Sequence, residues 1–292
     1  MVKYIKEDRK LSVISDAIIF ILLSFVAFLI LSIFREIFIS QDIERNDIYA
    51  SYDLEDPLEV ETVDYINKIK EEYSINVKYG ISQKDIASRV GATVEMDNAI
   101  INNNIKIIYN ALGKYDKEMF QNIEKEGYKI SIILLDKFEN NNLALASRNK
   151  LNQFTLYISN TERLERAFHH EMCHILEYYL SDKNIEFSEW NDLNPENFKY
   201  LNDTSDITSD NVYYLSKYSS SNVNDIYFVT KYSKVNEKED RAEIFAEIMI
   251  STDKINYIED KTPIYYKYIT LVNLFKINIP YSNFKNYYQV DF

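Results

Sequence analysis

Residues 168–176 read FHHEMCHIL and contain the pattern His-Glu-x-x-His at positions 170–174. On a helix, His170 and His174 are one turn apart, so their imidazoles project from one face with the spacing that a single Zn²⁺ requires. Glu171 flanks that face, where the general base for a zinc-activated water belongs. The alternative is a surface helix with incidental histidines. A packed, amphipathic helix is favoured instead by the apolar residues Leu164, Phe168, Ile175 and Tyr179.

A catalytic zinc takes three protein ligands and keeps one position open. The chain has three histidines, at positions 169, 170 and 174, so we expect the third ligand to be a carboxylate. Residues 237–249 (EKEDRAEIFAEIM) place Glu239, Glu243 and Glu247 on one helical face. One of them can bind zinc while the next accepts a hydrogen bond from a ligand histidine. The spacing leaves the pairs Glu239/Glu243 and Glu243/Glu247 both open, and a solvated acidic face is the simpler alternative.

The surrounding pattern predicts an α+β domain with two lobes around the helix that carries the histidines. Two buried strands are expected ahead of that helix, at Lys129–Phe138 and Phe154–Ile158. The helix itself is expected to run from Thr161 to about Leu180, opened by a capping box of Ser159 and Glu162. The other predicted helices are Pro57–Tyr73, Asp97–Leu112 with its stripe continued by Tyr115, Met119 and Ile123, a helix near Glu237–Ser251, and one near Pro263–Phe275.

Residues 11–34 (LSVISDAIIFILLSFVAFLILSIF) form an apolar run long enough to span the hydrocarbon core of a bilayer. Lysines and an arginine in residues 1–10 favour a cytoplasmic N-terminus. A cleaved signal peptide is disfavoured because no small-x-small site follows the run. We therefore expect a cytoplasmic segment 1–10, a transmembrane anchor 11–34, a stalk 35–56 and an extracytoplasmic domain 57–292.

Composition limits the remaining possibilities. The formal charge of −13 and the pI of about 4.8 argue against a nucleic-acid partner. Cys173 is the one cysteine, so no intrachain disulfide can form. It is expected to be a small buried thiol and not a ligand, because it projects away from the two metal-facing histidines. His169 is expected to serve in packing or in support of the ligands. Nothing in the sequence indicates the oligomeric state.

Two blocks, FHHEMCHIL and residues 228–249 (FVTKYSKVNEKEDRAEIFAEIM), resemble the zinc-binding metallopeptidases of Firmicutes. The pattern of that family is a HHExxH helix followed by FV-x-x-Y and N-x-x-E-D-x-A-E-x-F. The chain is more remotely similar to the catalytic domain of anthrax lethal factor and to the Pro-Pro endopeptidases. The resemblance implies a zincin-like, two-lobed metallopeptidase fold of the gluzincin type.

The same resemblance implies roles for single residues. It makes Glu239 the zinc ligand beside His170 and His174, and Glu243 the supporting carboxylate in the outer shell. It also aligns Tyr232, seven residues before Glu239, with a tyrosine that donates to the developing oxyanion. An ordinary packed tyrosine is the alternative for this position.

The sequence therefore predicts a membrane-anchored zinc metallopeptidase that hydrolyses a peptide or protein substrate. Two alternatives remain open: a zinc amidohydrolase that acts on other amides, and a binding module whose metal is structural or absent. A structural metal is disfavoured, because a closed structural site normally has four protein ligands and the sequence offers three. Residues 181–225 match no family element, so the sequence does not indicate the substrate. The aromatic run from Tyr213 to Tyr232 and Trp190 are candidates for lining the cleft.

Overall fold

The computed structural model describes residues 56–94, 96–149, 152–201, 227–250 and 262–284. All of them belong to one compact unit, Leu54–Phe292. Four predicted features lie outside the described residues: the segment 1–10, the anchor 11–34, the stalk 35–56 up to residue 55, and most of the aromatic run 213–232. No helix within the described ranges has the length and apolar character needed to cross a membrane.

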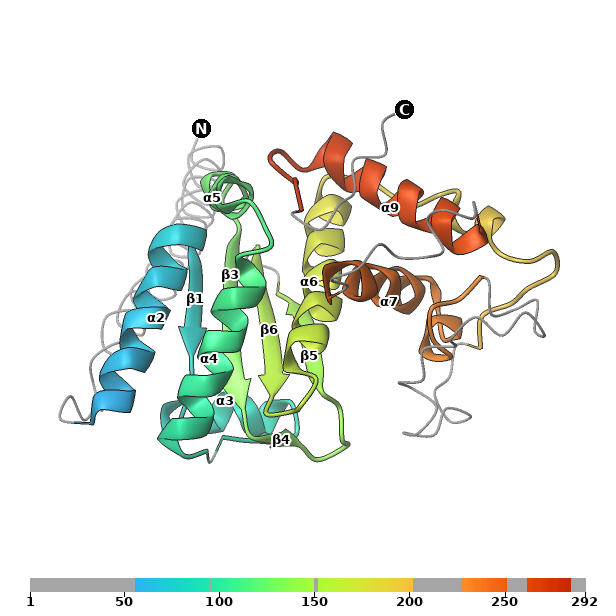
Figure 1. The fold of residues 1–292 in the computed structure, drawn as a ribbon. Helices are drawn as coiled ribbons and strands as arrows, with labels where there is room; N and C mark the ends of the chain where they lie inside the picture. Colours follow the sequence, from blue (N-terminus) through green and yellow to red (C-terminus); the bar gives the residue numbers. More distant parts are fainter. Residues whose placement is uncertain (1–55, 95, 150–151, 202–226, 251–261, 285–292) are drawn as a thin grey trace, which may run out of the picture. The chain divides into compact units, whose positions relative to one another are not determined.

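A four-stranded sheet forms the core of the N-terminal half, in the order β1-β3-β6-β5 (Figure 1). Parallel pairing joins β1 (Ile75–Lys78) to β3 (Lys129–Leu135), and β3 to β6 (Gln153–Ser159). The last strand, β5 (Ala144–Arg148), runs antiparallel to β6. Alternate residues of β6 are buried, because a strand turns successive side chains to opposite faces.

One strand predicted from the sequence corresponds to two strands in the structure. The prediction of a single strand over Lys129–Phe138 is wrong, because β3 ends at Leu135 and β4 (Lys137–Phe138) pairs with β2 (Ala92–Thr93) in a separate antiparallel sheet. Asp136 makes the change of direction: its N–H donates to Thr93 O, and its Oδ2 accepts from Thr93 Oγ1. The predicted strand Phe154–Ile158 is confirmed within β6. Strand β6 lies inside the sheet, between β3 and β5. Strand β5, which was not predicted, forms the edge beside it.

Three helices in the N-terminal half pack against the sheet or one another: α2 (Pro57–Tyr73), α4 (Asn98–Leu112) and α5 (Lys117–Lys125). The predicted bounds of α2 and α4 are confirmed, with Asp56 and Asp97 as N-caps that accept from backbone N–H groups. The stripe expected to continue α4 instead belongs to α5 and the turn before it, where Tyr115, Met119 and Ile123 are buried. A short turn η1 (Ile81–Gln83) and helix α3 (Lys84–Arg89) complete this half.

Helix α6 (Leu164–Asp182) lies between this half and the C-terminal helices, and contacts β5, β6, α4 and α7. The capping box predicted at its start is wrong. Ser159 is the last residue of β6, and its hydroxyl donates to Leu143 O in the loop before β5. The helix therefore begins at Leu164, three residues later than predicted. Most of its length is buried, because it packs on the sheet and on α7.

The C-terminal half is helical and contains α7 (Glu237–Ile250), α9 (Pro263–Asn278) and the short turns η2 (Trp190–Leu193) and η5 (Tyr232–Lys234). Both predicted helices are present, and α9 runs three residues past its predicted end at Phe275. A fully buried ion pair joins them: Lys267 Nζ of α9 lies 2.6 Å from Asp240 Oδ2 of α7. Trp190 Nε1 and the Tyr200 hydroxyl donate to the same oxygen. The chain is thus a mixed α and β protein in which α6 is packed from both sides.

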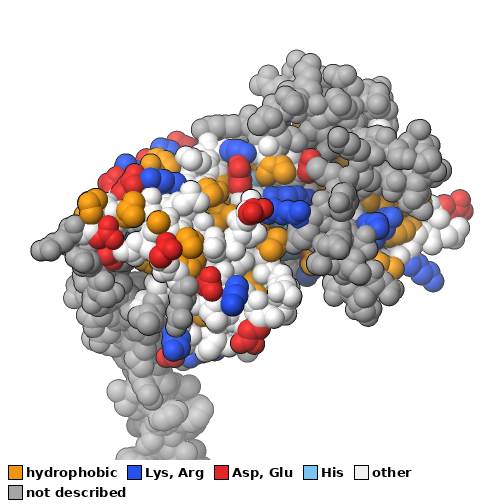
Figure 2. Space-filling model, turned by 60° about the horizontal axis from the view of Figure 1, so that its bottom comes forward, with side chains coloured by type: hydrophobic (Ala, Val, Ile, Leu, Met, Phe, Trp, Pro, Cys, Tyr) orange, Lys and Arg blue, Asp and Glu red, His pale blue; other side chains and the backbone are white. Residues whose placement is uncertain are grey.

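The surface seen in Figure 2 mixes acidic and basic side chains with single apolar ones. The exposed large apolar side chains are spread over α2, β5, α9 and two loop positions: Leu58, Val60, Leu145, Leu201, Tyr266, Ile277 and Tyr281. Scattered apolar residues of this kind are ordinary on a protein surface. This face of the described residues therefore gives no indication of a partner.

Candidate metal centre

The two histidines of the motif lie on the face of α6 that is turned to α7. Both are buried, and their ring centroids are 5.0 Å apart. Because four residues make about one helical turn, His170 and His174 present neighbouring imidazoles to the same volume. Apolar residues on the other faces of α6, among them Phe168, Met172 and Ile175, fix the helix in the core.

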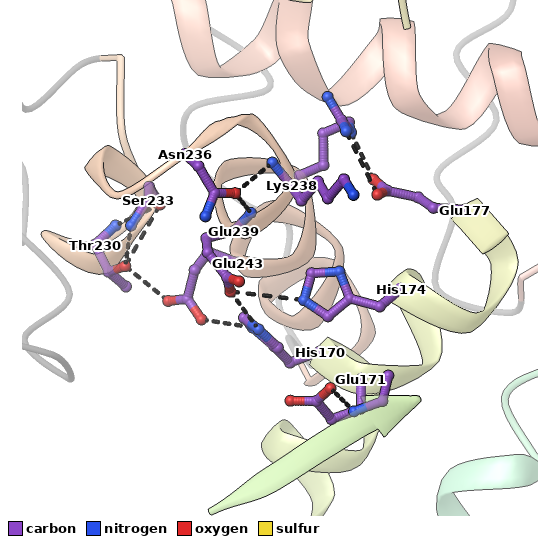
Figure 3. Close-up of polar contacts among 12 residues, drawn as sticks. His170, Glu171, His174, Glu177, Thr230, Ser233, Asn236, Lys238, Glu239 and Glu243 are labelled. Carbon is purple, nitrogen blue, oxygen red and sulfur yellow. Dashed lines mark hydrogen bonds and ion pairs between the residues drawn. The ribbon is translucent and has the colours of Figure 1, made fainter. Parts of the chain in front are cut away.

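Two carboxylates of α7 point toward these imidazoles (Figure 3). Glu239 Oε2 lies 3.0 Å from His170 Nε2 and 3.6 Å from His174 Nε2. Glu243, one turn later, accepts a hydrogen bond of 2.9 Å from His170 Nδ1. The first turn of α7 is held by Asn236, whose Oδ1 accepts from the N–H groups of Lys238 and Glu239. The two helices thus bring together residues that are 65 to 73 positions apart.

The arrangement of His170, His174 and Glu239 fits a tetrahedral zinc ion. One ligand atom from each of the three lies within 4.8 Å of the other two. Zinc binds histidine nitrogen and carboxylate oxygen at about 2.0–2.2 Å, so tetrahedral ligand atoms lie roughly 3.3–3.6 Å from one another. The separations of 3.0 and 3.6 Å from Glu239 to the two histidines bracket that value. The three donors therefore match the chemistry and spacing of a His₂Glu zinc site.

The electrostatics of the cluster favour a cation. Burial lowers the pKa of His170, but hydrogen bonds with Glu239 and Glu243 outweigh burial and raise it to about 10. Burial raises the pKa of Glu243, whereas the Arg166 guanidinium and His170 lower it to about 2. The pKa of Glu239 is lowered by its two histidine neighbours, again against burial. Both carboxylates are therefore charged at neutral pH, and they surround the imidazoles with negative charge.

Glu171 is buried on the same helix but turns toward β5 and away from α7. Its Oε2 accepts a hydrogen bond of 2.5 Å from the backbone N–H of Ala146, in the middle of β5. Burial raises the pKa of Glu171, although the two histidines oppose this shift. A carboxyl group with a raised pKa, next to a possible metal site, is suited to take up and release a proton.

Tyr232 lies in η5, just before α7, with its ring centroid 6.0 Å from that of His170. The segment that carries it is tied to the carboxylate of Glu243, because the Thr230 hydroxyl donates to Glu243 Oε2 at 2.7 Å. Ser233 in turn bonds to Thr230 through its N–H. The structure thus places the Tyr232 ring near that of His170, and its role as a donor to the oxyanion stays a prediction.

The remaining candidates lie apart from the three donors. Glu247 is buried one turn beyond Glu243 and is not part of the cluster of three donors. Of the three α7 glutamates, Glu239 is the one whose carboxylate lies close to both histidines. Cys173 is fully buried in the core, and burial raises its pKa well above the usual value. His169 Nδ1 bonds to the Tyr115 hydroxyl at 2.7 Å. Trp190 is fully buried and bonds to Asp240, so it does not line a cleft.

Two further residues at the cluster were not predicted from the sequence, Arg166 and Thr230. Arg166 makes two hydrogen bonds to Glu243, one to each carboxylate oxygen, at 2.9 and 2.8 Å. Its position, one turn before His170 on the helical face shared by His170 and His174, was a signal that the sequence contained. Thr230 had no such signal, because it precedes α7 in an irregular segment.

Comparison with known proteins adds little to this geometry. No protein-family model matches the chain, and no curated protein matches it. A crystal structure of a putative zinc-binding metallo-peptidase from Bacteroides caccae aligns at 15% identity with a TM-score of 0.44. The alignment covers 79% of this chain and 90% of that one.

The geometry predicts that the full-length chain binds one zinc ion, and that binding depends on Glu239 more than on Glu243 or Glu247. His170→Ala and Glu239→Ala should lose stoichiometric zinc, because two protein ligands remain in each. Glu243→Ala should weaken binding by about 10–100-fold, as expected for a carboxylate that supports a ligand histidine. Elemental analysis and isothermal titration after chelation measure both effects.

Glu247→Ala is the matched control, since it removes a buried carboxylate from the same face of α7 and should retain zinc. Zinc loss in Glu243→Ala, together with retention in Glu239→Ala, would contradict this assignment and shift the ligand by one helical turn.

Proposed function

We propose that this protein is a zinc-dependent metallopeptidase with a zincin-like, two-lobed fold. The observation that carries the proposal is the convergence of His170, His174 and Glu239 at the separations of a His₂Glu zinc site, with Glu171 beside them. A structural site would not require that neighbouring glutamate, and it would normally have a fourth protein ligand. In the described part of the chain, the cluster contains three.

In the proposed mechanism, Nε2 of His170, Nε2 of His174 and a carboxylate oxygen of Glu239 would hold the metal. Bound zinc supplies Lewis-acid polarisation of the scissile carbonyl and a water of lowered pKa. Glu171 accepts the proton of the attacking water and returns it to the nitrogen of the leaving amine. Its Oε2 is held by the Ala146 N–H, so Oε1 is the atom assigned to this transfer.

Tyr232 is proposed to donate its phenolic hydrogen to the oxyanion that develops on the scissile carbonyl. This role comes from the resemblance of residues 228–249 to the metallopeptidases, and the 6.0 Å separation of the Tyr232 and His170 rings supports it. The tyrosine comes from the C-terminal half and Glu171 from the central helix, so the reacting carbonyl would lie between the two lobes.

Strand β5 supports a peptide substrate over other amides. It ends the four-stranded sheet, and the Ala146 N–H that binds Glu171 points away from β6 and toward the site. An extended peptide can pair with an edge strand through main-chain hydrogen bonds. At Ala146 itself the N–H is bound to Glu171 and the C=O accepts from the Tyr178 hydroxyl, so pairing would use the outer groups of the neighbouring β5 residues. A small amide from another source has no comparable use for a strand edge. We therefore propose a peptide or protein substrate.

The function is tested by digesting a peptide library with the zinc-loaded, full-length chain and reading the products by mass spectrometry. Cleavage that a chelator abolishes and added zinc restores is the expected result. The Glu171→Gln variant is the control for contaminating proteases, since it is purified in the same way. An intact library, under conditions in which zinc binding is demonstrated, would exclude peptidase action and leave the amidohydrolase and binding-module alternatives.

Two variants separate the proposed roles of the residues that act on the substrate. Glu171→Gln keeps the size of the side chain but removes its basic carboxylate, so zinc should stay bound while kcat falls by about 10²–10⁴-fold or more. Tyr232→Phe should also keep zinc and should lower kcat by about 10²–10³-fold, the usual cost of one oxyanion donor. Unchanged kcat in either variant, measured on a peptide from the library, would remove that residue from the mechanism.

We also propose that residues 11–34 anchor the protein in a membrane, with residues 1–10 cytoplasmic and the catalytic domain outside. The apolar run and the basic residues before it support this orientation. Protease treatment of intact protoplasts should digest the domain from Pro57 onward and leave a small membrane-bound fragment. Protection of the domain in intact protoplasts, with digestion after lysis, would place it on the cytoplasmic side.

A further inference from the structure

The contact between α6 and α7 extends one turn beyond the proposed ligands. On α6, Arg166, His170 and His174 follow one another at intervals of four residues, and on α7 the facing carboxylates are Glu243 and Glu239. His174 and His170 both lie within 4 Å of Glu239, and His170 and Arg166 both bond to Glu243. The partners on α6 and α7 follow one another in opposite chain order along this polar seam, which lies where the two helices pack on each other.

Glu243 is the centre of the seam and is nearly inaccessible, with 3% of its side chain exposed. Its Oε1 accepts from His170 Nδ1 and from Arg166, and its Oε2 accepts from Arg166 and from the Thr230 hydroxyl. A buried carboxylate is tolerated only when its charge is compensated and its oxygens are hydrogen-bonded. Arg166 provides that compensation from α6, one turn before His170.

From this geometry we propose that Arg166 is a positioning residue for the metal centre and acts through Glu243. The inference rests on the proposed zinc site. A carboxylate that accepts from Nδ1–H of a ligand histidine fixes its tautomer and turns Nε2 toward the metal. Glu243 can do so only while its own carboxylate is held in one orientation, and the two parallel hydrogen bonds from the Arg166 guanidinium impose that orientation.

A purely structural role is the competing explanation, because Arg166 also joins two packed helices. Lys114 offers a matched comparison. It lies 2.7 Å from Glu165 of α6 and donates to Met249 O of α7, so it too connects both helices by its positive charge. Its ammonium group does not contact Glu243 or either ligand histidine. Replacing Lys114 therefore removes the same charge and a similar link, without disturbing the carboxylate on His170.

The test measures zinc affinity by competition with a chromophoric chelator, on the full-length chain in mild detergent. Thermal unfolding in excess chelator reports stability separately. Arg166→Met should raise the zinc Kd by about 10–100-fold, whereas Lys114→Met should leave it at the wild-type value. Arg166→Lys should lie between wild type and Arg166→Met, since an ammonium group keeps the charge but cannot make the two parallel bonds. The visible spectrum of the Co²⁺-substituted protein should change in Arg166→Lys and stay unchanged in Lys114→Met.

A double variant tests the route of the effect. In a Glu243→Gln background, Arg166→Met should cause no further loss of zinc affinity, because the carboxylate through which it acts is gone. Wild-type affinity and a wild-type Co²⁺ spectrum in Arg166→Lys would overturn the inference, even if Arg166→Met does not fold. So would equal losses of zinc affinity in Arg166→Met and Lys114→Met. Failure of the wild-type chain to bind zinc would instead refute the proposed function on which the inference rests.

Discussion

The buried carboxylate of Glu243 is the constraint on which the rest of the site depends. It accepts hydrogen bonds from three side chains, two of which belong to α6 and one to the segment before α7. Removing any one partner would leave a charged group in a low-dielectric interior with fewer bonds than it needs. The orientation of His170, the approach of α7 to α6 and the position of the Thr230–Tyr232 segment are therefore set by one group.

A second layer of buried charge supports the same helix contact. The Arg241 guanidinium of α7 lies over the Phe187 and Trp190 rings and forms a buried ion pair with Glu177 of α6 at 2.5 Å. Asp240, one residue earlier, binds Lys267 of α9. Consecutive residues of one helical turn thus serve three purposes: Glu239 faces the histidines, Asp240 faces α9, and Arg241 faces the end of α6. Because buried pairs of this kind demand exact partners, they are better suited to fixing geometry than to adding stability.

Much of the site was predictable from the sequence, because helical periodicity converts spacing into direction. The motif at 170–174 and the face of Glu239, Glu243 and Glu247 needed only that rule, and the bounds of α2 followed from Pro57 and its neighbours. The long-range contacts did not follow. Arg166 and Glu243 are 77 residues apart in the sequence. The periodicity of α6 therefore indicates the helical face on which Arg166 lies, but it does not identify Glu243 as its partner.

The errors in the fold have local causes. Ser159 and Glu162 have the spacing of a capping box, but the Ser159 hydroxyl instead donates to Leu143 O, just before β5. The change of sheet at Asp136 is set by a hydrogen bond to Thr93, which lies 43 residues earlier. Strand β1 is four residues long, and β5 (ALASR) contains no β-branched or aromatic residue, so neither has the composition and length that mark a strand; β5 is defined by its pairing with β6. Its importance for the site, through the Ala146 N–H, could be seen only in three dimensions.

The measurement that tests the account most directly is anomalous X-ray diffraction at the zinc absorption edge from crystals of the zinc-loaded protein. The account predicts one anomalous peak per chain, about 2.0–2.2 Å from Nε2 of His170, Nε2 of His174 and a carboxylate oxygen of Glu239. Glu243 should remain on His170 Nδ1 with Arg166 across its two oxygens. A peak bound to Glu243 in place of Glu239, a peak away from the two histidines, or the absence of any peak would contradict it.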